Sequence, residues 1–287
     1  MIAELAIVKT VIATTQTLIQ IIKGIRDRKR ERKVKEEYIK DLFGFVGDAD
    51  FSTGNVPPDD VDSLRLFKEW FHQHLRKERP IKERVQLPPV NVNKHLCSIG
   101  GPVDHPLTRY GMGYERKGDR WLGVLPFYFD LKGTESSGIT IRRAYKGVHW
   151  ETLNWRITDR DGRLKFVPGT DKDRILNKDY FMLIIAPNTF TDQAIYTGQK
   201  HMIIACAHGL AQLAIKDLFD NNRFLEELIK VRGRNEYFQA IIEIYAEHSK
   251  EGYIPALKWR ETVPPMIVEP LDLNDFTRKL KRYEEWT

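Results

Sequence analysis

Two stretches of the chain share one layout, in which a short apolar run is followed by a turn of small residues and then by an expected helix. The later stretch is KHMIIACAHGLAQLAIKDLF at residues 200–219, and its apolar run ends at residues 207–209. The earlier stretch is HLCSI at residues 95–99, followed by Gly-Gly-Pro at residues 100–102 and by a predicted helix start near residues 105–108. Apolar runs this short are typical of strands covered on both faces of a sheet. We therefore predict an α/β fold with helices on both faces of its sheet.

The composition supports a folded body in a reducing compartment. The chain has 287 residues, of which 41% are hydrophobic, so one large domain or two ordinary ones can be built around a real core. Cys97 and Cys206 lie far apart, each inside a predicted strand, and no CxxC motif is present. We interpret both as small apolar core residues. This use of cysteine favours a cytoplasmic location, with membrane association as an alternative.

The positive charge of the protein is concentrated in one short stretch. Residues 23–35, KGIRDRKRERKVK, contain eight Lys and Arg against two Asp and Glu, whereas the whole chain has a net charge of +6. The rest of the chain therefore sums to zero, which is not the charge distribution of a generally basic nucleic-acid binder. Non-specific attachment to nucleic acid through this stretch is the weakest of the partner hypotheses.

An amphipathic helix is predicted at the N-terminus. Six residues between positions 5 and 22 are spaced alternately three and four apart, which is a heptad seam: Leu5, Val8, Ile12, Thr15, Ile19 and Ile22. Val11, Leu18 and Ile25 flank the seam and widen the apolar stripe. The helix is expected to continue through the basic stretch to about Leu42.

Three roles are open for this helix. It can self-associate or pack on the body, which makes a homo-oligomer the expected state. It can instead lie on a membrane surface with its basic stretch against anionic lipid. A membrane-spanning helix is the third role, but no uninterrupted apolar run approaches the roughly 18 to 20 residues that spanning requires.

The chain divides into three predicted parts. Residues 1–43 form the amphipathic and basic helix, residues 44–92 form a linker and a helix, and residues 93–287 form the α/β domain. Within that domain, residues 121–167 are expected to form an antiparallel β insertion. The insertion contains Asp-Arg-Asp-Gly at residues 159–162, a strong hairpin-turn signal.

Three further elements are predicted from local pattern. The helix of the second part is expected at residues 61–77, between a capping Asp60 and the break at Pro80. The run FMLIIA at residues 181–186 is expected to be a buried strand. Residues 236–246 combine helical and extended features, and a strand is favoured there.

Ligands of open α/β sheets bind beyond the carboxyl ends of the strands, and three predicted loops qualify. They span residues 100–109, 187–191 and 207–210, where small residues allow backbone N–H groups to face an anion. The candidate ligand-binding residues are Gly100, Gly101, Thr108, Arg109, Asn188 and Gly209. The candidates for proton transfer are His208 and Asp104.

Each candidate also has a structural interpretation. Gly100 and Gly101 can form only a tight turn, His208 can be a satisfied buried histidine, and Asp104 or His105 can cap the helix that follows. The eight histidines are scattered, so no metal site is predicted, and the HExxH, GxSxG and P-loop patterns are absent. No cofactor is indicated, and the choice between an enzyme and a binding protein stays open.

Three segments together resemble a family of uncharacterised prokaryotic domains. They are SIGGPVDHPLTR, KDYFMLIIAPNTF and HMIIACAHGLAQLA, which match the family's GGPxxNxxT, DYGLI…NPF and AGxHGxGTxxA motifs in order and spacing over roughly residues 93–218. This sequence departs from the motifs at His105 (Asn in the family), Phe181 (Gly), Cys206 (Gly) and Ala211-Gln212 (Gly-Thr). The resemblance implies a Rossmann-like fold and, by analogy, nucleotide recognition; the family has no activity to carry over.

Two hypotheses of function follow. In the first, a Rossmann-like module binds a nucleotide or another small anionic molecule at the three loops, and the N-terminal helix assembles or localises it. In the second, the protein is a non-enzymatic interaction scaffold that acts through oligomerisation or membrane-surface association of that helix.

Overall fold

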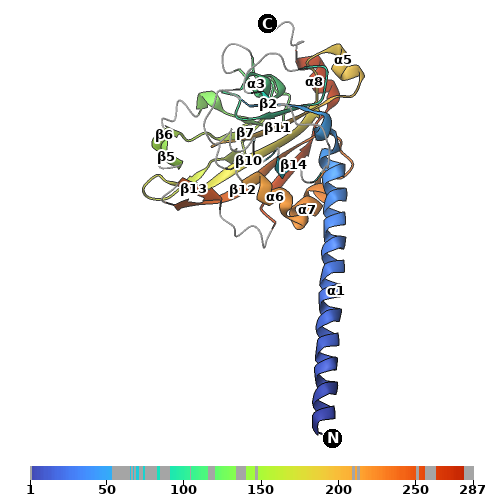
Figure 1. Ribbon diagram of the computed structural model, residues 1–287. Helices are drawn as coiled ribbons and strands as arrows, with labels where there is room; N and C mark the ends of the chain where they lie inside the picture. The colour runs from blue at the N-terminus through green and yellow to red at the C-terminus, as the bar shows by residue number, and fades with distance from the viewer. Residues whose placement is uncertain are drawn as a thin grey trace.

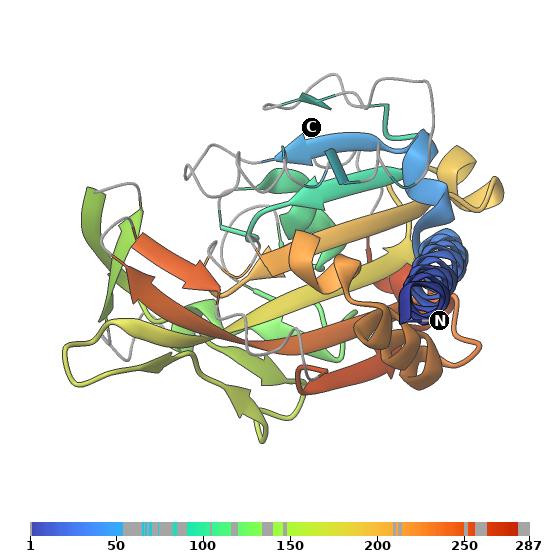
Figure 2. The same ribbon diagram turned by 60° about the horizontal axis from the view of Figure 1, so that its bottom comes forward.

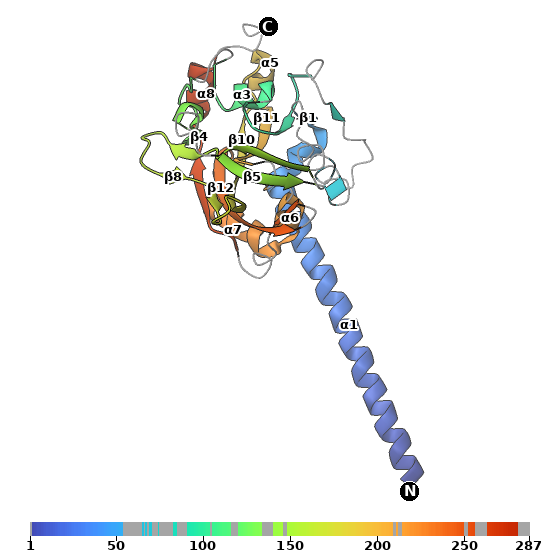
Figure 3. The same cartoon turned by 90° about the vertical axis from the view of Figure 1, so that its left-hand side faces the viewer.

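The N-terminal helix leaves the body of the protein as a single rod. The structure is a computed structural model that describes residues 2–53, 65, 67, 69–70, 74, 83–84, 91–103, 105–115, 120–133, 140–145, 148–208, 211, 214–249, 252–255 and 263–280. Helix α1, Ile2–Phe43, has 42 residues, which corresponds to a length of about 60 Å. Only its C-terminal end meets the body, and the remainder projects away from it (Figure 1, Figure 3).

The body is built on one mixed sheet. Within the described residues it has eleven strands, nine of which form the path β2-β1-β3-β11-β10-β12-β13-β5-β6, while β14 also pairs with β12 and β9 with β10. The strands are β1 (Asp50–Thr53), β2 (Glu83–Arg84), β3 (Leu96–Ile99), β5 (Thr140–Tyr145), β6 (Val148–Leu153), β9 (Gly169–Thr170), β10 (Leu176–Pro187), β11 (Lys200–Cys206), β12 (Phe238–Ser249), β13 (Gly252–Pro255) and β14 (Met266–Pro270).

The strand directions divide this sheet into two halves. The neighbours β2, β1, β3 and β11 run parallel to one another. From β11 onward every neighbouring pair is antiparallel, beginning with β10 against β11 and β12 against β10. The protein is therefore a mixed α/β protein, as predicted, but its parallel order covers only one part of the sheet.

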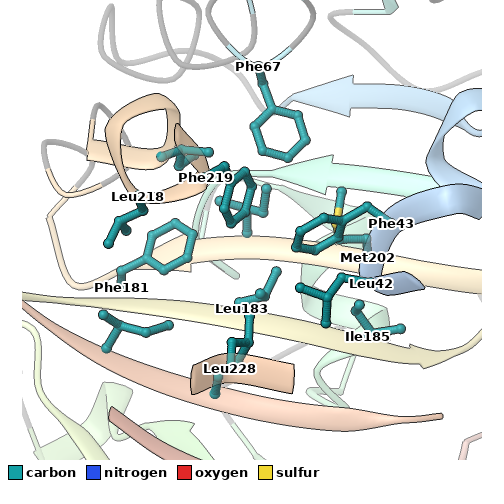
Figure 4. Close-up of a cluster of buried hydrophobic side chains, with 14 of the residues drawn as sticks. Leu42, Phe43, Phe67, Phe181, Leu183, Ile185, Met202, Leu218, Phe219 and Leu228 are labelled. Carbon is teal, nitrogen blue, oxygen red and sulfur yellow. The ribbon is translucent and has the colours of Figure 1, made fainter. Parts of the chain in front are cut away.

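Helices cover both faces of the sheet. Alternate residues of β3 show this: Cys97 and Ile99 belong to one apolar cluster, whereas Leu96 belongs to another on the opposite face. The first cluster lies under α6 (Ile215–Asp220), α7 (Asn222–Arg232) and the end of α1 (Figure 2, Figure 4). The second lies under α3 (Pro106–Gly111) and α8 (Leu273–Lys279). The remaining short helices are η1 (Gly44–Asp48) and α5 (Asp192–Tyr196).

The predicted β insertion contributes to two sheets. Strands β4 (Phe127–Phe129), β7 (Ile157–Asp159) and β8 (Lys165–Phe166) form a separate antiparallel sheet, whereas the β5–β6 hairpin extends the main sheet through β13. The turn between β7 and β8 is the one that the sequence predicted. Gly162 adopts a φ of +71° there and donates its N–H to the Asp159 carbonyl at 3.0 Å.

Most predicted elements are present with shifted boundaries. The strands expected at residues 95–99, 181–186, 200–206 and 236–246 are confirmed as β3, β10, β11 and β12. The helix after β11 begins only at Ile215. The helix predicted at 61–77 lies mostly outside the described residues, although the described members of that range are helical: Arg65, Phe67, Glu69, Trp70 and His74. Strand β1 was not predicted; it comes from the expected linker and pairs with β3.

Candidate functional site

Two of the three predicted loops lie at the same edge of the sheet. Strands β3 and β11 are parallel, so residues 100–102 and residues 207–208 both follow carboxyl ends at that edge. Gly100 donates its N–H to the Ile204 carbonyl at 2.9 Å and has a φ of +126°, a conformation that favours glycine. A Cβ on Gly101 would meet nothing within 4 Å. Asp104 and Gly209, two of the predicted site residues, lie outside the described part of the chain.

Asn188 lies at the opposite edge. Because β10 is antiparallel to β11, its end is paired with Lys200 at the start of β11. The Asn188 amide donates to the carbonyls of Val92 and Lys94 at 2.9 and 2.7 Å, and its Oδ1 accepts the Phe190 N–H at 3.1 Å. Asn188 is fully buried and fixes the chain that enters β3. The third predicted loop therefore does not converge with the other two.

Thr108 and Arg109 are used within the fold. Thr108 is fully buried on α3. Arg109 donates to the Glu115 carbonyl at 2.9 Å and to the Pro102 carbonyl at 3.4 Å, and its guanidinium lies over the Tyr114 ring at 5.9 Å from the centroid. A guanidinium held by two backbone carbonyls and an aromatic face ties the Gly-Gly-Pro turn to the end of α3. It is not presented to a ligand.

His208 is also buried, with 1% of its surface exposed. Its Nε2 lies 3.4 Å from Asn154 Oδ1, and the Cys206 thiol donates to the His208 carbonyl at 2.8 Å. These contacts favour the structural interpretation of His208.

A buried polar cluster under α3 was missed by the sequence analysis. Ser98 Oγ and His201 Nε2 are 2.8 Å apart, and both side chains are at most 1% exposed. His105 caps α3, one of the two caps that the sequence allowed, and its Nδ1 accepts the Thr108 N–H at 3.3 Å. Burial lowers the pKa of His105 to about 4, and burial, with His105 nearby, lowers the pKa of His201 to about 3.

A hydroxyl at this distance from an imidazole matches the geometry of a nucleophile and its base. Burial nevertheless withholds Ser98 and His201 from any substrate, so we interpret the pair as a structural hydrogen bond. Each residue lies inside an apolar run, and the only signal in the sequence was a polar residue within a strand buried on both faces.

The described part of α1 exposes apolar side chains to solvent. Residues 20–33 are all exposed, and Ile21, Ile22 and Ile25 have 54%, 57% and 51% of their surface exposed. Only the last turns are anchored: Leu42 and Phe43 are buried in the first cluster, where the Phe43 ring lies 4.8 Å from the Phe219 ring (Figure 4). Contiguous apolar side chains exposed on one face are a common feature of interaction surfaces.

A groove lies where the basic stretch of α1 meets the body. It has a volume of about 500 Å³, and we call it the α1 groove; its lining is Arg28, Glu31, Arg32, Lys35, His74, Asp220 and Asn222. Asp220 is the meeting point of three side chains in this region. One oxygen of this carboxylate lies 3.2 Å from Lys35 Nζ, 3.0 Å from Trp70 Nε1 and 3.7 Å from His74 Nε2.

Comparison with protein-family models, with curated proteins and with solved structures finds no match for the chain. Over the described residues, no helix combines the length and apolarity needed to cross a membrane. The same part of the chain holds no group of three His, Cys, Asp or Glu side chains placed to bind a metal ion.

Proposed function

We propose that the protein is an interaction module in which α1 joins copies of the chain and thereby brings their α/β bodies together. The observation that carries this proposal is the course of α1: one continuous helix leaves the body and exposes isoleucine side chains to solvent (Figure 1). Burying such side chains against a second copy contributes about 25 cal/mol per Å² of apolar surface.

The heptad pattern supports a second copy of the chain as the partner. The seam that includes Ile19 and Ile22 has the spacing of a coiled coil, in which identical helices bury the same positions against each other. Continuing that spacing past Ile22 reaches Arg26 and Lys29, whose charges are costly in such a seam. We infer that the paired segment ends near Ile25. The basic stretch would then separate the coil from the bodies.

The neighbouring isoleucines Ile21 and Ile22 provide a matched test. They have the same side chain and nearly the same exposure, but only Ile22 lies on the seam. Ile22→Asp should lower the molar mass of the assembly that the full-length protein forms in solution toward the value of one chain, whereas Ile21→Asp should leave that mass unchanged. If both variants lowered the molar mass equally and both lost binding to anionic vesicles, a membrane surface would be favoured as the partner of α1.

The body is proposed to contain a Rossmann-like unit in the parallel half of the sheet, as the family resemblance implies. The β3–turn–α3 segment supports this, because Gly100 makes the tight turn that precedes a helix in such units. The contacts of Arg109 and Asn188 argue against an anion site formed by the three predicted loops.

A further inference from the structure

We propose that the α1 groove binds a small soluble molecule that carries a phosphate group. This is a separate function from assembly, because the groove lies on the body-proximal part of α1, beyond the end of the inferred coil. Its volume of about 500 Å³ falls in the range of small-molecule sites, about 300 to 1,000 Å³.

The basic residues of the groove lie on one face of α1. Arg28, Arg32 and Lys35 are spaced four and three apart, so their side chains emerge on the same side of the helix, toward the body. Lys35 is committed to Asp220, and its side chain is only 19% exposed. The Arg32 side chain, by contrast, is 62% exposed.

The charges at the groove leave its arginines available to an anion. Asp220 already receives the Lys35 ammonium and the Trp70 indole N–H, so its charge is largely offset. Arg32 pairs at 3.1 Å with Glu36, an exchangeable surface contact outside the groove lining. Within the described part of the chain, Arg28 makes no ion pair or hydrogen bond. Glu31, the other carboxylate of the lining, opposes an anion there.

The chemistry of the side chains selects the ligand class. A guanidinium presents N–H groups as a planar fork that matches two oxygens of one phosphate, and two arginines one helical turn apart can hold a phosphate between them. The net charge of the whole basic stretch raises the local concentration of such anions. A ligand held by Arg28 and Arg32 on α1 and by the groove wall around Asn222 would contact both α1 and the body.

Pyrophosphate is a suitable probe, with binding to the full chain measured by isothermal titration calorimetry at about 50 mM salt. The test variant is R28Q/R32Q. The control is R30Q/K33Q, which removes the same two charges from exposed positions of the same helix that do not line the groove. Circular dichroism of both variants checks that the fold is retained.

We expect R28Q/R32Q to weaken pyrophosphate binding at least tenfold and R30Q/K33Q to weaken it less than threefold. The proposal is overturned if the wild-type protein does not bind pyrophosphate. It is also overturned if the two variants lose affinity equally, because equal loss would mean that the positive charge of the helix attracts pyrophosphate without a defined site. A parallel arm uses vesicles containing phosphatidylglycerol. Arginine-dependent vesicle binding without pyrophosphate binding would replace the soluble ligand by a lipid headgroup. Neither result depends on the oligomeric state.

Discussion

Lys35 on α1 and Asp220 at the end of α6 form an ion pair of 3.2 Å between positions 185 residues apart in the sequence. A second ion pair joins α1 to α7, where Arg232 pairs with Asp41 at 2.6 Å. Together with the buried Phe43 they fix the direction in which α1 leaves the body. The projection of the helix is therefore a consequence of its anchored end, and the anchor itself can be tested.

Removing the aromatic anchor should destabilise the body. Phe43 is fully buried against Phe219, so Phe43→Ala is expected to lower the free energy of unfolding by about 3 to 5 kcal/mol. Ile21→Ala on the exposed part of the same helix should change it by less than about 0.5 kcal/mol. Urea denaturation followed by tryptophan fluorescence measures both. Similar values for the two variants would show that α1 is not packed on the body.

The carboxylate of Asp220 should matter more than its ion pair with Lys35. Lys35→Gln removes one partly exposed pair and is expected to cost less than about 1 kcal/mol. Asp220→Ala also deprives the buried Trp70 indole of its acceptor, with an expected cost of about 1 to 3 kcal/mol. Thermal unfolding of the two variants compares these costs. A larger loss of stability in Lys35→Gln than in Asp220→Ala would contradict the role assigned to the Asp220 carboxylate.

Stability should fall on mild acidification because His105 and His201 are buried as neutral side chains. Their folded pKa values, about 4 and about 3, lie below the unfolded value of about 6.5, so unfolding takes up protons once the pH drops below about 6.5. The contribution that these two neutral histidines make to the free energy of unfolding is fully present above pH 6.5. It is lost as the pH falls toward 4 for His105 and toward 3 for His201. The contribution of His105 is on the order of 3 kcal/mol.

The variant His105→Asn isolates this effect, because asparagine also caps helices but does not titrate. Denaturation curves between pH 7.5 and pH 5 should show a smaller loss of stability for the variant than for the wild type. An identical pH dependence in the two proteins would rule out His105 as a source of the acid sensitivity.

Alanine substitutions at the two glycines of the turn after β3 should differ in their effect on stability. Gly100 has a φ of +126°, which side chains other than hydrogen rarely adopt, so Gly100→Ala is expected to cost about 1 to 3 kcal/mol. A Cβ on Gly101 meets no atom within 4 Å, so Gly101→Ala should be close to neutral. Melting temperatures of the two variants decide this, and equal shifts would contradict the assigned turn geometry.

Local pattern was enough to predict the buried strands but not how they pair. The apolar runs that became β3 and β11 are recognisable by their length and composition, and the hairpin turn at residues 159–162 by its Asp and Gly. The direction of β10 depends on contacts with strands distant in sequence, and no residue within β10 encodes it. The expectation that Asn188 joins the Gly100 loop failed for this reason.

The candidate site was harder to predict than the fold. Arg109 has the residue type of a phosphate ligand, yet it is consumed by the carbonyls of its own loop, a use that only the folded geometry reveals. The α1 groove combines Arg28 with Asp220, which are far apart in the sequence, so no motif marks it. The heptad seam is the opposite case, because regular spacing along one helix can be recognised from sequence alone.

The most direct test of the proposed assembly is the molar mass of the full-length wild-type chain in solution, measured by size-exclusion chromatography with light scattering over a range of protein concentrations. Self-association through α1 predicts an integer multiple of the chain mass of 33.6 kDa, which falls toward one chain in the Ile22→Asp variant. A mass of 33.6 kDa for the wild type at every concentration would contradict the proposal.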